Sequence, residues 1–214
     1  MKLLLLPLVV LAIGANTAPA TGTEKPLLRA SSEMPTPDSV RPTPSLVQTV
    51  LRSLDKDDVQ LLDDCLKSNG LTHGDYASLL RAVRIPSRGG RTLWFVRPAM
   101  EPYCGALYGA HLFRYFLVEQ QRGRSKPRYR IIFENGGDAF AVYRRISHGL
   151  NDIEPGGCIA SGCRSARMSF DGHQYKPVRC FLTTWDGKGR EVTRIRKCDS
   201  DHGSDIQASG FVRD

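Results

Sequence analysis

The spacing of apolar residues changes near Gly70. Between Ser45 and that point they recur at helical intervals, which predicts two short N-terminal helices. Pro44 suits the first turn of the first helix, Asp55 suits the N-cap of the second, and Asn69-Gly70 suits its end. The apolar residues of the two helices are Leu46, Val47, Val50, Leu51 and Leu54, then Val59, Leu61, Leu62, Cys65 and Leu66.

After Gly70 the apolar period falls to two, which is typical of strands. Asp171-Gly172 is the strongest hairpin turn in the chain, and Asn135-Gly136-Gly137 is expected to close another hairpin. Residues 110–119 are apolar on both faces, which suits a central strand packed on a helix. The expected strands span residues 78–85, 92–97, 110–119, 129–134, 139–145, 165–170, 173–178 and, less regularly, 191–197.

Together these elements predict an α+β fold, with two short N-terminal helices followed by a mostly antiparallel, hairpin-rich sheet of about seven strands. The helices are expected to cover one face of that sheet. The alternative is that the sheet closes into a half-open barrel.

The two ends of the chain differ from its middle. Residues 1–20 combine a positive start, an apolar run and an A-x-A-like site, which predicts a signal peptide cleaved near Ala20. No run is long enough to span a bilayer, so no transmembrane segment is expected in the mature chain. Residues 21–44 are rich in Pro, Thr and Ser and are expected to be a disordered linker. Residues 45–198 then form a single α+β domain, and residues 199–214 a loose C-terminal tail.

All six cysteines follow the expected cleavage site, and an even number in an exported chain predicts disulfides. The sequence does not choose among the pairings, although proximity favours Cys158–Cys163 and then Cys180–Cys198. That choice leaves Cys65–Cys104 to tie the helices to the sheet. A zinc site is not favoured, because the chain has no C-x2-C pair and its histidines lack ligand spacing. No metal and no cofactor are expected.

The net charge of +8 and the pI of about 9.4 favour an acidic protein or an anionic envelope component as partner. No nucleic-acid-binding motif accompanies the basic residues. Arginine and tyrosine anchor many protein interfaces, and they interleave with apolar residues on the expected strands. The predicted binding residues are Arg128, Arg130, Arg144, Arg145, Arg167, Tyr143 and Tyr175. The alternative is a basic surface that serves only solubility.

His111 is the best catalytic candidate, because it follows a glycine-containing turn and a carboxylate such as Glu119, Asp152 or Glu154 would orient it as a general base. The alternative is a half-buried strand histidine, and that alternative is favoured. Cys104 does not suit a nucleophile, since an exported thiol is normally oxidised. The chain contains no G-x-S-x-G, phosphate-binding glycine cluster or H-E-x-x-H.

Two short segments carry a resemblance. Leu150-Asn151-Asp152-Ile153, followed by Ser169-Phe170-Asp171-Gly172-His173-Gln174-Tyr175, resembles the strand–turn–strand step of FG-GAP-like repeats in secreted bacterial proteins. Similar segments occur in small periplasmic inhibitor-type domains. The calcium-binding Asp-rich turn of the repeats is missing, so the resemblance implies an exported binding module without a metal.

The sequence therefore predicts a periplasmic or secreted protein of the bacterial envelope that binds a partner without catalysis, as an inhibitor, immunity-type protein or accessory factor. One alternative is a secreted hydrolase of a polyanionic or glycan substrate. Another is a polyanion-binding module, whose retention on heparin would weaken steeply with salt.

Overall fold

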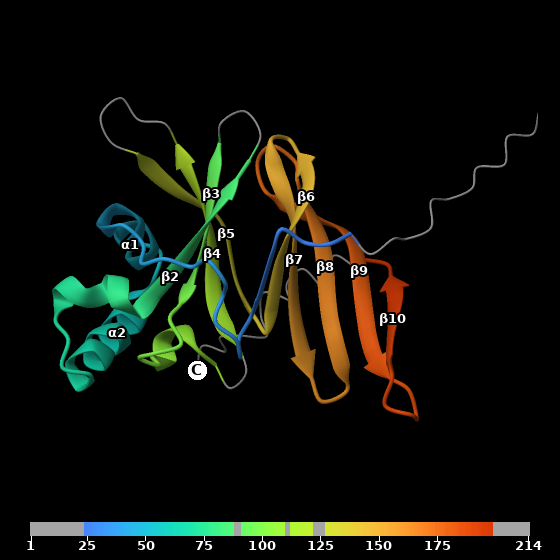
Figure 1. The fold of residues 1–214 in the computed structure, drawn as a ribbon, viewed down its shortest axis with the longest axis horizontal. Helices are drawn as coiled ribbons and strands as arrows, with labels where there is room; N and C mark the ends of the chain where they lie inside the picture. Colours follow the sequence, from blue (N-terminus) through green and yellow to red (C-terminus); the bar gives the residue numbers. More distant parts are fainter. Residues whose placement is uncertain (1–23, 88–90, 110–111, 122–126, 199–214) are drawn as a thin grey trace, which may run out of the picture.

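The computed structural model describes residues 24–87, 91–109, 112–121 and 127–198, and these residues form two antiparallel sheets with helices on one side (Figure 1). The helices are α1 (Pro44–Leu51), α2 (Lys56–Ser68) and the 3-10 helices η1 (His73–Leu79) and η3 (Gly105–Leu107). The strands are β1 (Leu28–Ser31), β2 (Leu80–Pro86), β3 (Thr92–Pro98), β4 (Phe113–Gln121), β5 (Arg128–Gly137), β6 (Ala139–Ser147), β7 (Leu150–Ile159), β8 (Gly162–Phe170), β9 (Tyr175–Trp185) and β10 (Glu191–Arg196).

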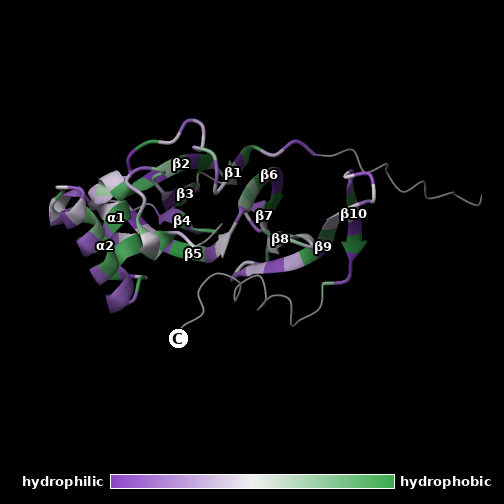
Figure 2. Cartoon of the chain, turned by 90° about the horizontal axis from the view of Figure 1, so that it is seen from below, coloured by the Kyte–Doolittle hydropathy of each residue, from purple (hydrophilic) through white to green (hydrophobic). Residues whose placement is uncertain are grey.

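The molecule has three layers. A four-stranded sheet of order β2-β3-β4-β5 lies between the helices and a six-stranded sheet of order β1-β6-β7-β8-β9-β10. One core fills the space between the two sheets, and a second core lies between the helices and the other face of the four-stranded sheet. In Figure 2, β9 and β10 extend past the four-stranded sheet, away from the helices.

β4 belongs to both cores because its side chains alternate between the two faces of the sheet. Phe113, Tyr115 and Leu117 pack in the core between the sheets, whereas Phe116 and Val118 pack in the core under the helices. β4 is an interior strand, so the prediction of a central strand packed on a helix is confirmed.

The predicted helix signals are also confirmed. Thr43 caps α1, whose first turn holds Pro44, and the Asp55 side chain caps α2 by accepting from the Asp58 N–H at 2.8 Å. α2 ends at Asn69. Local capping explains these ends, because the groups involved are three or four residues apart.

The predicted fold class was wrong. Strands hold 51% of the described residues and helices 19%, and the strands form two sheets rather than one α+β sheet. The error lies at the turn Asn135-Gly136-Gly137, which does not close a hairpin. These residues end β5, which pairs with β4, and Asp138 then leads into β6 of the other sheet. A Cβ on Gly137 would overlap the Gly156 carbonyl, so the glycine permits the close approach of the two sheets.

The expected linker also differs from the structure. Residues 28–31 form β1 and pair with β6, and Val40 bridges to Ala82 of β2. Arg97, which is 2% exposed, donates to the Ser31 carbonyl at 2.7 Å and to the Met34 carbonyl at 2.9 Å. Hydrogen bonds to β6 and to Arg97 therefore hold this segment in place, because it has too few apolar residues to offset the entropy lost on ordering.

The three favoured disulfides are present. Cys65–Cys104 joins α2 to the residue before η3, Cys158–Cys163 spans the hairpin of β7 and β8, and Cys180–Cys198 links β9 to the residue that follows Lys197. Three disulfides indicate an oxidising, extracytoplasmic location. In the described part of the chain, no helix is long and apolar enough to cross a membrane. The predicted signal peptide, its cleavage site and the C-terminal tail lie outside the described residues.

Candidate functional site

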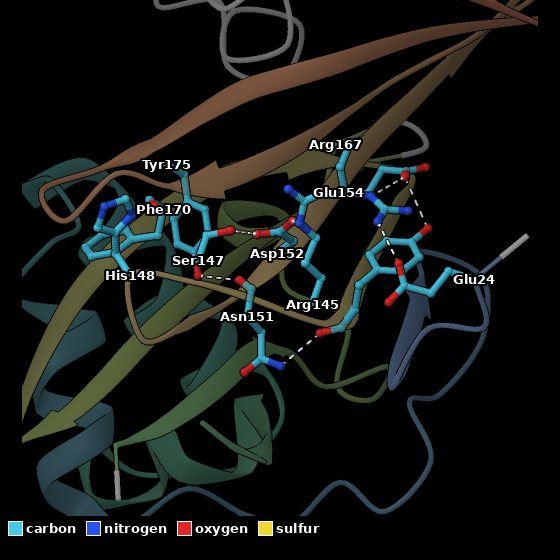
Figure 3. A network of polar contacts seen from close by, with 11 residues as sticks. Glu24, Arg145, Ser147, His148, Asn151, Asp152, Glu154, Arg167, Phe170 and Tyr175 are labelled. Carbon is cyan, nitrogen blue, oxygen red and sulfur yellow. Dashed lines mark hydrogen bonds and ion pairs between the residues drawn. The ribbon is translucent and has the colours of Figure 1, made fainter. Parts of the chain in front are cut away.

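Glu154 lies on β7 between β6 and β8 and accepts hydrogen bonds from both neighbours. Tyr143 Oη donates at 3.1 Å, Ser165 Oγ at 3.2 Å and Arg167 Nε at 3.2 Å. The Arg167 guanidinium also lies 3.2 Å from the centre of the Tyr143 ring and pairs with Glu24 at 3.2 Å (Figure 3). Burial and the Glu154 carboxylate raise the pKa of the Tyr143 phenol, so Tyr143 remains a donor to Glu154 at neutral pH.

Asp152, two residues before Glu154 on β7, is fully buried. Its Oδ1 accepts from Ser147 Oγ at 2.7 Å, and its Oδ2 lies 3.4 Å from Arg145 Nε. The Asp152 and Glu154 carboxylates are thus each paired with an arginine of a neighbouring strand. The two carboxylates considered as partners of His111 in catalysis thus act as counter-ions for Arg145 and Arg167, two of the predicted binding residues.

This arrangement suits charge pairing better than acid/base catalysis. A general acid or base must reach the proton that it transfers in the substrate, and the Asp152 side chain is only 1% exposed. His111 lies outside the described residues. His148, in the turn between β6 and β7, has its Nδ1 2.9 Å from the Phe170 carbonyl.

The predicted binding residues do not form one surface. Arg128 and Arg130 belong to β5 of the four-stranded sheet, whereas the others lie on the six-stranded sheet. Tyr143 and Tyr175 are 5% and 6% exposed, so they are held in the interior and do not present their rings to a partner. Period-two spacing placed both tyrosines on strands, but burial depends on which layer covers that face. Arg144 and Arg145 on β6 are exposed.

The pairing of two partly exposed arginines with the buried Glu119 was not predicted. Glu119 of β4 is 5% exposed and accepts from Arg91 Nε at 2.6 Å and from Arg130 Nη2 at 3.0 Å. Arg91 also donates to the His148 carbonyl at 3.2 Å, which connects the two sheets. The sequence did contain one signal for this pairing: Glu119 is a charged residue in an otherwise apolar strand. A carboxylate buried there needs a cationic partner.

A strongly basic exposed region lies elsewhere, on β9 and β10. Residues 176–197, named here the basic edge, contain seven lysines and arginines against two carboxylates, a surplus of five in a chain of net charge +8. Every residue of β10 except Val192 is exposed. The arginines were visible in the sequence, but only the sheet topology places them on a strand at the end of a sheet.

The described residues contain no group of three or more His, Cys, Asp or Glu side chains that could hold a metal ion. Comparison with known proteins found no matching family model, no matching curated protein and no matching solved structure.

Proposed function

We propose that the chain is an exported binding protein of the bacterial envelope that captures an acidic partner through the basic edge. It would act after removal of residues 1–20, in the periplasm or outside the cell, as an inhibitor, immunity-type protein or accessory factor. The three disulfides support an extracytoplasmic protein with a rigid fold.

One observation carries the proposal. Neighbouring side chains of β10 point to opposite faces of the sheet, and both Arg194 and Ile195 are exposed. Both faces of this strand are therefore uncovered in the described structure, and the strand belongs to the basic edge, which has a surplus of five positive charges. Such a surface steers an acidic protein toward the strand and accelerates association.

Affinity capture tests the proposal. The chain beginning at Thr21 is immobilised and exposed to envelope extract of the source organism, beside Arg194→Glu/Arg196→Glu and the control Arg84→Glu. Arg84 is an exposed arginine on β2, in the other sheet. We expect an acidic protein to be retained by the unmodified chain and by the control, and retention to fall at least about tenfold with the double reversal.

Equal retention by all three forms, or no retained protein, contradicts the proposal. Melting temperatures of the variants must agree with that of the unmodified chain, so that lost binding is not lost folding. Retention on heparin that falls steeply with salt, without capture of a protein, would favour the polyanion-binding alternative.

A further inference from the structure

The open side of β10 offers backbone hydrogen-bonding groups. Among the described residues β10 pairs with β9 and is the last strand of its sheet. The Asp186 N–H donates to the Arg190 carbonyl at 2.9 Å, which marks that pair as hydrogen-bonded. Hydrogen-bonded and non-hydrogen-bonded pairs alternate in antiparallel strands. The N–H and C=O groups of Glu191, Thr193 and Ile195 therefore point to the open side.

The two faces of this strand differ in chemistry. Ile195 lies opposite Phe181 on one face, and Trp185 lies on the same face four pairs further along β9, opposite Glu191. Ile195 is 62% exposed and Trp185 is 46% exposed, so these two apolar side chains are uncovered, on a face that also carries Thr193 and Glu191 of β10. The other face carries Arg194 and Arg196.

We infer that β10 binds an extended acidic segment of the partner protein, which pairs with it as a seventh strand of this sheet. This inference rests on the proposed function and adds the mode of binding. Side chains of the added strand alternate between the faces, so carboxylates would lie beside Arg194 and Arg196 while apolar side chains cover Ile195. The partner segment thus alternates acidic and apolar residues, with backbone hydrogen bonds providing affinity.

The charge of the edge distinguishes this occupant from a second copy of the chain. Pairing β10 with another β10 would bring the cations of two identical strands together, and like charges on adjacent strands are destabilising. Positive residues on an edge strand oppose association of copies through that edge. An acidic strand offers the same backbone hydrogen-bonding groups as a second β10, but its charge is opposite to that of Arg194 and Arg196, so its pairing is favourable.

The experiment uses synthetic peptides of about ten residues, long enough for one strand. The first peptide alternates Glu and Val, the second alternates Lys and Val, and the third is the first peptide with alternate backbone nitrogens methylated. Calorimetry measures their affinities for the chain beginning at Thr21. We expect the Glu-Val peptide to bind, the Lys-Val peptide to bind at least about tenfold more weakly, and methylation to weaken binding about tenfold or more.

Two substitutions at one position separate backbone pairing from charge. Thr193→Pro removes an N–H that points to the open side, whereas Thr193→Ala retains it. Both lose the contact of 2.8 Å between the Thr193 and Thr183 hydroxyls, so the alanine variant is a matched control. We expect Thr193→Pro to weaken Glu-Val binding about tenfold and Thr193→Ala to change it less than about threefold.

If the proline variant does not fold, the methylated peptide still tests the pairing on the unmodified chain. Equal binding of the methylated and unmethylated peptides overturns strand addition, and equal binding of the Glu-Val and Lys-Val peptides overturns the acidic character of the added strand. Capture of an acidic envelope protein that withstands Thr193→Pro but is lost in Arg194→Glu/Arg196→Glu overturns only this mode of binding. The proposed function fails separately, when no envelope protein is retained at all.

Discussion

Replacing Arg97 with methionine removes a buried guanidinium that attaches the N-terminal segment to β3. The Arg97 side chain donates to the Ser31 and Met34 carbonyls and, at 3.2 Å, to the Thr36 hydroxyl. Its guanidinium carbon also lies 4.4 Å from the centre of the Phe113 ring. A single side chain thus joins residues 31–36, β3 and the core between the sheets.

The expected loss follows from these contacts. A hydrogen bond to a charged group contributes about 1.5–3 kcal/mol, and Arg97→Met removes several such bonds. The methionine also removes the cost of burying a charge, which offsets part of the loss. We expect the free energy of unfolding to fall by about 3–5 kcal/mol. Arg97→Lys keeps the charge but not the planar donor fork, so its loss is expected to be smaller, about 2 kcal/mol.

Urea unfolding measures the free energy, and hydrogen exchange shows where protection is lost. In Arg97→Met, the amides of residues 28–40 are expected to exchange faster relative to those of β7 and β8. Arg84→Met, at an exposed position, is the control and should change the free energy by less than about 0.5 kcal/mol. A loss below about 1 kcal/mol for Arg97→Met, or unchanged exchange at β1, refutes this account.

Three other predictions concern the rest of the fold. Replacing both Cys65 and Cys104 with serine opens a loop whose ends are 39 residues apart and should lower the free energy of unfolding by about 4 kcal/mol in urea unfolding. Burial and the hydrogen bond to Asp63 raise the pKa of Tyr76 to about 12, from an ordinary value of 10.0. Its contribution to stability is therefore complete below about pH 10 and is lost as the pH rises through about 12. Ultraviolet titration checks this, since Asp63→Asn should lower the midpoint and an unchanged midpoint contradicts the assigned cause. Gly137→Ala should lower the melting temperature by the equivalent of about 1–3 kcal/mol, because its Cβ meets the backbone of the facing sheet.

The local features of the fold were predictable. The ends of α2 depend on Asp55 and Asn69, whose partners are within four residues. The turn at Asp171-Gly172 joins β8 to β9, where the Asp171 side chain accepts from two following backbone N–H groups. Each feature depends on groups that the sequence already places close together.

The candidate site was only partly predictable, because the roles of its residues depend on contacts between positions far apart in the sequence. Asp152 and Glu154 were identified as candidate partners of a catalytic His111, and Arg145 and Arg167 as candidate binding residues. The structure joins these two sets into ion pairs across β6, β7 and β8. No spacing in the sequence shows that β8 brings Arg167 beside Glu154.

The two helices, the hairpin at Asp171-Gly172 and the disulfide Cys158–Cys163 could be predicted from the sequence, because they depend on contacts between residues near one another in the chain. The division of the strands into two sheets at Asp138, the burial of Arg97, and the position of β10 at the edge of its sheet among the described residues came from the three-dimensional packing. A period of two shows which side chains share a face of a strand. It does not show which strand lies beside it, since that choice depends on packing between distant segments.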